Sequence, residues 1–151
     1  MNAHTNPYPG FRSVAFVLPI QTKSLANLRW HWARKAKLAA EQRGIVLLAL
    51  RGLCRPFRLP EAVRAPKARP GGRSVPAMAL LEVTLTRIAP RELDDDNLRG
   101  ALKSVRDGVA DCLGVDDRDK RVAWLYEQRR GRPKEYAVSV QIRVPDCAKQ
   151  M

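Results

Sequence analysis

Aspartates gather in one part of this sequence, in two runs. The first run is "RELDDDNLRG" at residues 91–100 and the second is "GVDDRD" at residues 114–119. Each added carboxylate makes its neighbours harder to ionise, so such runs need a cation, a helix end or solvent to offset the repulsion. Three or more converging carboxylates would bind Mg²⁺ or Mn²⁺ through oxygen. The ion would polarise a phosphate and lower the pKa of an attacking water, which fits phosphodiester cleavage.

Each run also has a purely structural interpretation. Aspartate and asparagine are favoured N-caps, so one of Asp95, Asp96 or Asn97 would cap a helix. In the second run, Asp116 or Asp117 would bond its own backbone in a solvated turn. On this interpretation the protein is a non-catalytic basic DNA-binding protein whose aspartates cap helices. A weaker alternative is an RNA-binding or assembly protein.

The distance between the two runs decides whether they form one site. Apolar residues recur at helical spacing from Leu98 to Leu113, and Gly114 is expected to stop that helix. The helix would be roughly 24 Å long, which places the runs at its opposite ends. They meet only if the helix is shorter, or if the chain after Gly114 doubles back along the sheet.

The remaining elements predict an α+β domain over residues 1–151, with a small mixed sheet of about four strands and helices packed on one side. Alternating or β-branched stretches predict strands at 13–20, 80–88, 121–129 and 136–144. The last two are expected to form an antiparallel hairpin around "GRPK" at 131–134. Residues 27–51 predict a helix with a possible interruption at Gly44. A basic Pro-rich loop is expected at about 54–76, and a short flexible tail at the C-terminus.

The charge favours a polyanionic partner, since 28 Lys and Arg oppose 15 Asp and Glu for a net charge of +13. Basic residues cluster around Trp30, His31 and Trp32 and again in the Pro-rich loop. Either tryptophan would pack in the core or stack on an unpaired base. The expected phosphate-binding residues are Arg29, Arg34, Lys35, Lys37 and Arg99, with Arg64, Lys67, Arg69 and Arg73 in the loop.

Several classes of protein are disfavoured. No apolar run reaches the roughly 18 residues of a membrane span, and the N-terminus lacks the features of a signal peptide, so no membrane association and a cytoplasmic location are expected. The three cysteines are widely spaced and form no CxxC pair, which argues against a disulfide framework and a zinc site.

Residues 93–117, "LDDDNLRGALKSVRDGVADCLGVDD", resemble the RusA-like Holliday-junction endodeoxyribonucleases. The family signature is Asp-x-Asp-Asn, a lysine, a further aspartate in the same helix and a later Asp-Asp. Upstream, "VLPIQTKSLANLRWHW" at 17–32 is loosely similar to the start of the family. The resemblance implies a RusA-like fold and a homodimer whose two active sites cut opposite strands of a four-way junction. It also implies a role in recombination or phage DNA processing.

The resemblance assigns roles by position. It implies that Asp94, Asp96 and Asp117 bind divalent metal, that Lys103 assists cleavage, and that Asn97, Asp107 and Asp116 support them. One position departs from the pattern, because the family lysine lies three residues after the asparagine, where this chain has Gly100. Lys103 projects about 60° from Gly100 on the same polar face, and helical side chains lean toward the N-terminus, so Lys103 is expected to reach. The alternatives are that Arg99 substitutes or that the site is catalytically weak.

Overall fold

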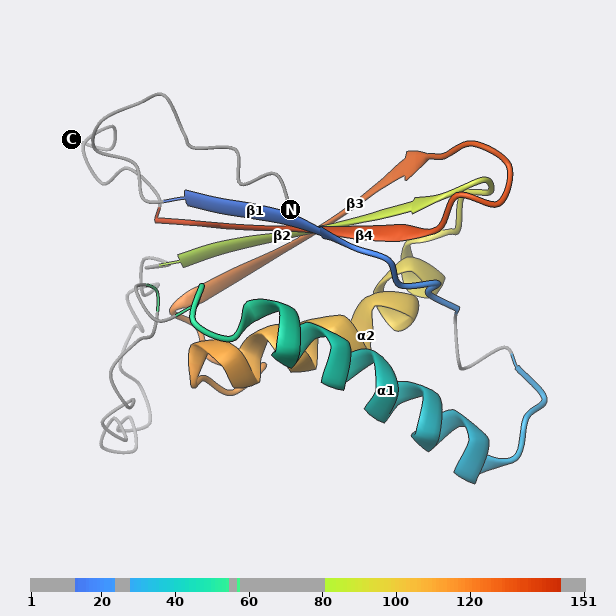
Figure 1. Cartoon of the computed structure of the whole chain (residues 1–151), viewed down its shortest axis with the longest axis horizontal. Coiled ribbons are helices and arrows are strands. Elements are labelled where there is room, and N and C mark those ends of the chain that lie inside the picture. The colour runs from blue at the N-terminus through green and yellow to red at the C-terminus, as the bar shows by residue number, and fades with distance from the viewer. Residues whose placement is uncertain (1–12, 24–27, 55–56, 58–80, 145–151) are drawn as a thin grey trace, which may run out of the picture.

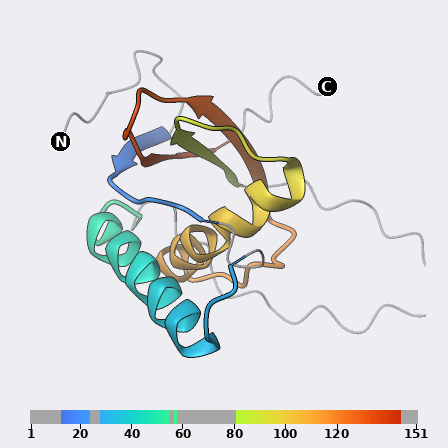
Figure 2. The same cartoon turned by 90° about the vertical axis from the view of Figure 1, so that its right-hand side faces the viewer.

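The fold has four strands and two helices in the order β-α-β-α-β-β. The computed structural model describes residues 13–23, 28–54, 57 and 81–144. The elements are β1 (Ser13–Leu18), α1 (Trp32–Leu50), β2 (Leu81–Ala89), α2 (Asp95–Leu113), β3 (Val122–Arg130) and β4 (Ala137–Arg143). Both helices pack on one face of the sheet (Figures 1 and 2), which confirms the expected α+β architecture.

The sheet is mixed and has the strand order β1-β4-β2-β3. β2 and β3 are parallel, with Leu81 opposite Val122, whereas β4 runs antiparallel to both β1 and β2. Alternate residues of each strand face the helices, which is why Val83 and Leu85 of β2 and Val140 of β4 are fully buried. The alternation of apolar residues therefore predicted the inner face correctly.

The expected hairpin between the last two strands is wrong. β3 and β4 lie on opposite sides of β2, and the connection between them passes the end of β2, where the Gly131 amide donates to the Ala89 carbonyl at 2.9 Å. β2 and β3 are parallel, so they need a crossover connection, and α2 provides it. β4 then pairs with the other edge of β2. The sequence pattern of two strands joined by a short loop is the same whether the strands pair with each other or lie on either side of a third strand.

α2 begins earlier than the apolar spacing indicated. Asp94 is its N-cap, rather than Asp95, Asp96 or Asn97, and Gly114 ends it in the left-handed conformation, as predicted. Apolar residues of α2, including Leu102, Val105 and Val109, are fully buried in the core. α1 starts at Trp32 rather than at residue 27 and continues through Gly44 without interruption. In the part of the chain that the structure describes, neither helix is long and apolar enough to cross a membrane.

Gly108 allows α1 and α2 to approach closely. A Cβ at this position would lie 2.9 Å from Val46 Cβ and 3.2 Å from the Arg43 carbonyl oxygen. We expect Gly108→Ala to destabilise the protein by up to about 2 kcal/mol, because overpacking costs about 1–3 kcal/mol and the gain in helix propensity offsets only about 1 kcal/mol of it. Urea denaturation measures the difference.

Gly44 provides the matched control for Gly108. It also lies inside a helix, but no described atom lies within 4 Å of a Cβ built there. Gly44→Ala is therefore expected to stabilise the protein by about 0.5–1 kcal/mol. Equal effects of the two substitutions would contradict a tight contact at Gly108.

Candidate active site

The two aspartate runs lie at opposite ends of the parallel strands β2 and β3. The first follows the C-terminal end of β2, and the second precedes the N-terminal end of β3. Because β2 and β3 are parallel, α2 must cross the sheet to connect them. Its 19 residues span about 28 Å, close to the roughly 30 Å of the nine-residue β2.

The first run forms the start of α2. Asp94 Oδ1 accepts from the Asn97 amide and Asp94 Oδ2 from the Asn97 side chain, both at 2.9 Å. These bonds, the backbone one first, lower the pKa of the Asp94 carboxyl. Asp95 and Asp96 are exposed in the first turn, where the helix dipole favours negative charge. Asp94 therefore has a structural role whether or not it also binds metal.

The second run folds back against the side of α2. Asp117 Oδ2 accepts from Arg106 Nη2 at 2.9 Å, and the same guanidinium donates to the Tyr126 hydroxyl. Asp116 Oδ1 accepts from the Arg118 amide at 2.8 Å. That bond, and next a side-chain hydrogen bond with Asp117, lower the pKa of Asp116. Asp116 and Asp117 therefore each have a donor close by, the Arg118 amide for the first and the Arg106 guanidinium for the second.

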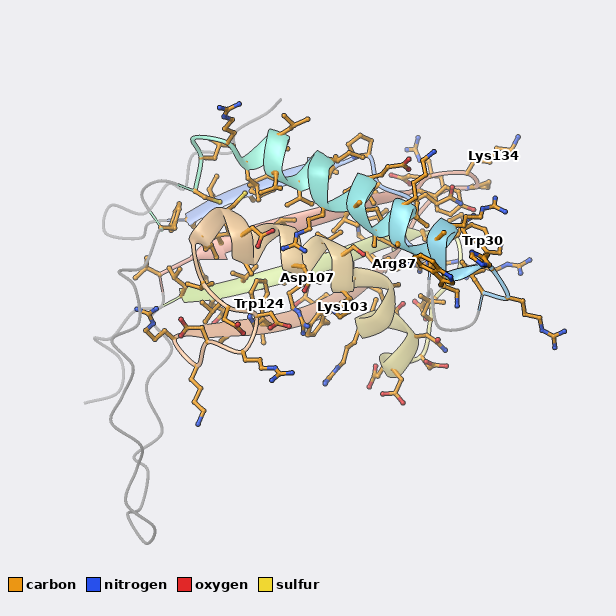
Figure 3. All side chains as sticks on the ribbon, turned by 90° about the horizontal axis from the view of Figure 1, so that it is seen from below. Trp30, Arg87, Lys103, Asp107, Trp124 and Lys134 are labelled. Atoms are coloured by element: carbon orange, nitrogen blue, oxygen red, sulfur yellow. The ribbon has the colours of Figure 1, made fainter. Side chains whose placement is uncertain are left out.

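Lys103 and Asp107 complete the group around the second run. Lys103 Nζ donates to Asp107 Oδ2 at 2.8 Å, so its side chain points one turn toward the C-terminus rather than toward Asp96 (Figure 3). Both residues line one pocket of about 290 Å³ with Asp111, Asp116 and Asp117. Arg43 of α1 also lines this pocket and forms an ion pair with Asp111.

The chain doubles back after Gly114, but it does not bring Asp117 to Asp94 and Asp96. Arg106, which binds Asp117, lies 12 residues after Asp94, or about 18 Å along the helix axis. One metal ion cannot bind carboxylates so far apart, since its ligands lie about 2.0–2.6 Å away. Among the described residues, no three His, Cys, Asp or Glu side chains form a group that could hold a metal ion.

The side chains of Asp96, Lys103 and Asp107 nevertheless project to one side of α2. Lys103 and Asp107 each project within about 20° of Asp96 at about 100° per residue. Asp96 and Lys103 are exposed, and Asp107 is half-buried beside Asp116 and Asp117. We refer to Asp96, Lys103, Asp107, Asp116 and Asp117 as the acidic stripe.

The expected DNA-binding residues surround the start of α1 and the side of α2. Arg29, Lys37 and Arg99 are exposed, and the Arg99 guanidinium lies 5.6 Å from the centre of the Tyr126 ring. The Arg34 guanidinium lies 3.9 Å from the centre of the Trp30 ring, with which it forms a cation–π contact. The basic loop residues lie outside the described part of the chain.

The two neighbouring tryptophans differ in exposure. Trp30 is half-buried, with Arg34 over its ring and Lys23 at 5.4 Å. Trp32 is 74% exposed and contacts the His31 ring at a centroid distance of 5.5 Å. Of the two, Trp32 offers a ring face to a base.

Two arginines of this region have roles that the sequence analysis missed. Arg106 binds Asp117, a contact between α2 and the turn after it that no local pattern of the sequence indicated. Arg87 is only 7% exposed and occupies an inward position of β2. The sequence does contain a signal for Arg87, because the alternation of Leu81, Val83 and Leu85 places residue 87 on the buried face, where a charged side chain is unusual.

Comparison with known proteins identifies one similar sequence of unassigned activity. No family model matches the chain. An uncharacterized protein of Xylella fastidiosa (strain Temecula1 / ATCC 700964) is 33% identical over 107 residues, which are 69% of this chain. The match spans 60% of the length of that relative.

Proposed function

We propose that this protein is a Mg²⁺-dependent endodeoxyribonuclease, resembling the RusA-like enzymes, that cleaves branched DNA such as Holliday junctions. The observation that carries the proposal is the acidic stripe along α2 and the turn that follows it, in a chain with a net charge of +13. Nine of the fifteen acids lie between Glu92 and Asp119, where they would repel the substrate unless a cation intervened. The role would be recombination or phage DNA processing in the cytoplasm.

The donor set fits a hard divalent cation in chemistry, since all of the acids offer carboxylate oxygens. The carboxylates of a single chain cannot surround one ion, because Asp94 and Asp96 lie far from Asp117. Asp94, Asp96 and Asp117 are the residues that would hold Mg²⁺ or Mn²⁺, and the ion would supply Lewis-acid activation of phosphate and water. These three residues would therefore need to come from more than one chain.

A homodimer with a two-fold axis crossing α2 would supply that arrangement. Two-fold symmetry places the same surface on both protomers, so two α2 helices in contact would run in opposite directions. The N-terminal Asp94 and Asp96 of one protomer would then lie beside the C-terminal half of the other helix, where Asp117 lies. Two such composite sites per dimer would act on the two strands of a junction.

The other residues would bind and orient the DNA. Arg29, Arg34, Lys35, Lys37 and Arg99 would neutralise backbone phosphates, with an affinity that falls as salt rises. Trp32 would stack on an unpaired base at the branch point. Lys103 would stabilise charge on the phosphate or the leaving oxygen after release from Asp107. Gly100 leaves the position of the family lysine without a side chain, so no nearer lysine competes for this role.

The alternative function is a basic DNA-binding protein without catalytic activity. It is favoured by the bonds of three aspartates: Asp94 caps α2, and Asp116 and Asp119 accept from the amides of Arg118 and Arg121. On this alternative, Asp96→Asn leaves DNA binding unchanged or tighter, and Mg²⁺ does not change thermal stability.

A cleavage assay tests the proposal directly. We expect the protein to cut a labelled synthetic four-way junction in Mg²⁺ or Mn²⁺, to lose this activity in EDTA, and to leave linear duplex of the same sequence intact. Parallel gel-shift measurements in Ca²⁺ separate binding from cleavage. Protein that binds the junction but never cuts it, with either metal, would leave the non-catalytic alternative.

A further inference from the structure

A second cavity lies beyond the C-terminal end of β2, away from the pocket of the acidic stripe. Its volume is about 560 Å³, and residues of the β1–α1 connection, β2 and the start of α2 line it. The basic residues Lys23, Arg87 and Arg91 are among them, and no carboxylate of a described residue is. This contrasts with the pocket of the acidic stripe, which has four aspartates in its wall.

Arg87 is the unusual residue of this cavity. Its guanidinium donates from Nε to Thr22 Oγ1 at 3.1 Å and from Nη1 to the Arg91 carbonyl at 2.7 Å. Both partners are neutral, and no ion pair to Arg87 is found among the described residues. A buried charge is costly unless an opposite charge compensates it, and burial accordingly lowers the pKa of Arg87.

The other partly buried arginines among the described residues have compensating acids. Arg106 binds Asp117 at 2.9 Å and Arg121 binds Asp119 at 2.7 Å. Arg87 differs because its guanidinium borders a cavity rather than a carboxylate. A guanidinium has five donors in a planar fork that matches phosphate oxygens, and two of these donors are accounted for above.

We propose that the Arg87 cavity binds the phosphate of a nucleotide unit, with Arg87 and Lys23 as the cationic ligands. The cavity is larger than a bare phosphate needs and lies in the range of about 300–1,000 Å³ of small-molecule sites. Leu28, Leu93 and Tyr136 would form walls for the attached sugar and base.

The position of Asn97 links this cavity to the candidate metal ligands. Asn97 lines the cavity and donates from its side chain to Asp94 Oδ2 at 2.9 Å. We therefore expect a phosphate in this cavity to flank the cleaved bond, with the Asn97 side chain between the cavity and Asp94. The choice of DNA as the source of the nucleotide unit rests on the proposed function.

Thermal unfolding in EDTA tests this inference without metal or cleavage. We expect sodium phosphate to raise the Tm more than sodium chloride of equal ionic strength and pH, and thymidine 5′-monophosphate to raise it further at equal concentration, because ligands that bind only the folded state stabilise it. Thymidine, which lacks the phosphate, should have no effect. Equal effects of phosphate and chloride, or an effect of thymidine alone, would overturn the inference and leave Arg87 as a structural tie.

Variants identify the residue that binds the phosphate. Arg87→Met should weaken binding of thymidine 5′-monophosphate by about tenfold or more, since charge-assisted hydrogen bonds are lost. Arg121→Met, which removes an arginine already paired with an acid, should leave binding unchanged even though it lowers the Tm. If Arg87→Met does not fold, the exposed Lys23→Gln should still weaken binding, and unaltered binding in that variant would contradict the site.

The nucleotide-binding experiment and the cleavage assay test the phosphate site and the nuclease proposal independently. An inactive protein whose Tm responds to the nucleotide retains the phosphate site and loses the nuclease proposal. A junction-cleaving protein that shows no nucleotide response loses only the site. A response to inorganic phosphate without one to the nucleotide would overturn the assignment to nucleic acid.

Discussion

Asp96→Asn and Asp117→Asn are each expected to reduce junction cleavage more than about 100-fold, since even changes to the outer partners of metal ligands cost about 10–100-fold. Each substitution removes a negative charge while retaining the size of the side chain. The Asp96 side chain is exposed and makes no hydrogen bond or ion pair with another described residue, so its replacement should not change the fold. Single-turnover rates with saturating enzyme measure the chemical step apart from binding.

Asp95→Asn is the matched control for Asp96. It makes the same change one residue away, in the same exposed first turn, but Asp95 projects about 100° from the acidic stripe. We expect cleavage near the wild-type rate. Asp117→Asn also breaks the ion pair with Arg106, so circular dichroism and the Tm must accompany its assay. Undiminished cleavage by Asp96→Asn would exclude this residue from the metal site.

Much of the fold could be predicted because local patterns determine it. The alternation of Val138, Val140 and Ile142 predicted an inner face of β4, and Gly114 predicted the end of α2, where its positive φ of 69° suits glycine. The hairpin could not be predicted correctly, because which edge of β2 receives β4 depends on long-range pairing. The start of α2 was placed late, since Asp94 caps the helix from outside its apolar stripe.

The candidate site was predictable in composition but not in position. The helical spacing placed Lys103 on the polar face of α2, and the side chain is exposed there. It did not determine the direction of Lys103, because an adjacent Asp107 offers an ion pair toward the C-terminus. Nor did it determine where Asp117 would lie, since Arg106 binds that carboxylate halfway along the helix. The Arg87 cavity could not be predicted from the sequence, because residues that are distant along the chain line it.

A subunit-mixing experiment decides whether the two ends of α2 act in one site. Heterodimers that carry Asp96→Asn in one protomer and Asp117→Asn in the other, purified through two different affinity tags, would contain one composite site with both lesions and one without any. We expect such a heterodimer to nick junctions at about half the wild-type rate, although each homodimeric variant is inactive. Sites within single chains predict no recovery, because every protomer carries a lesion.

The matched control places both lesions at the same end of α2. A heterodimer of Asp94→Asn and Asp96→Asn would carry a lesion in each composite site, so we expect it to remain inactive. Recovery in this control would indicate subunit exchange or contaminating wild-type protein, and a wild-type protein that sediments as a monomer would contradict the dimer. Recovery confined to the Asp96 and Asp117 combination would assign the metal to carboxylates that one chain holds about 15 Å apart along α2, since Asp117 lies at Arg106. The opposed carboxylates and the cation between them would then form part of the dimer contact, since the acidic ends repel each other without it.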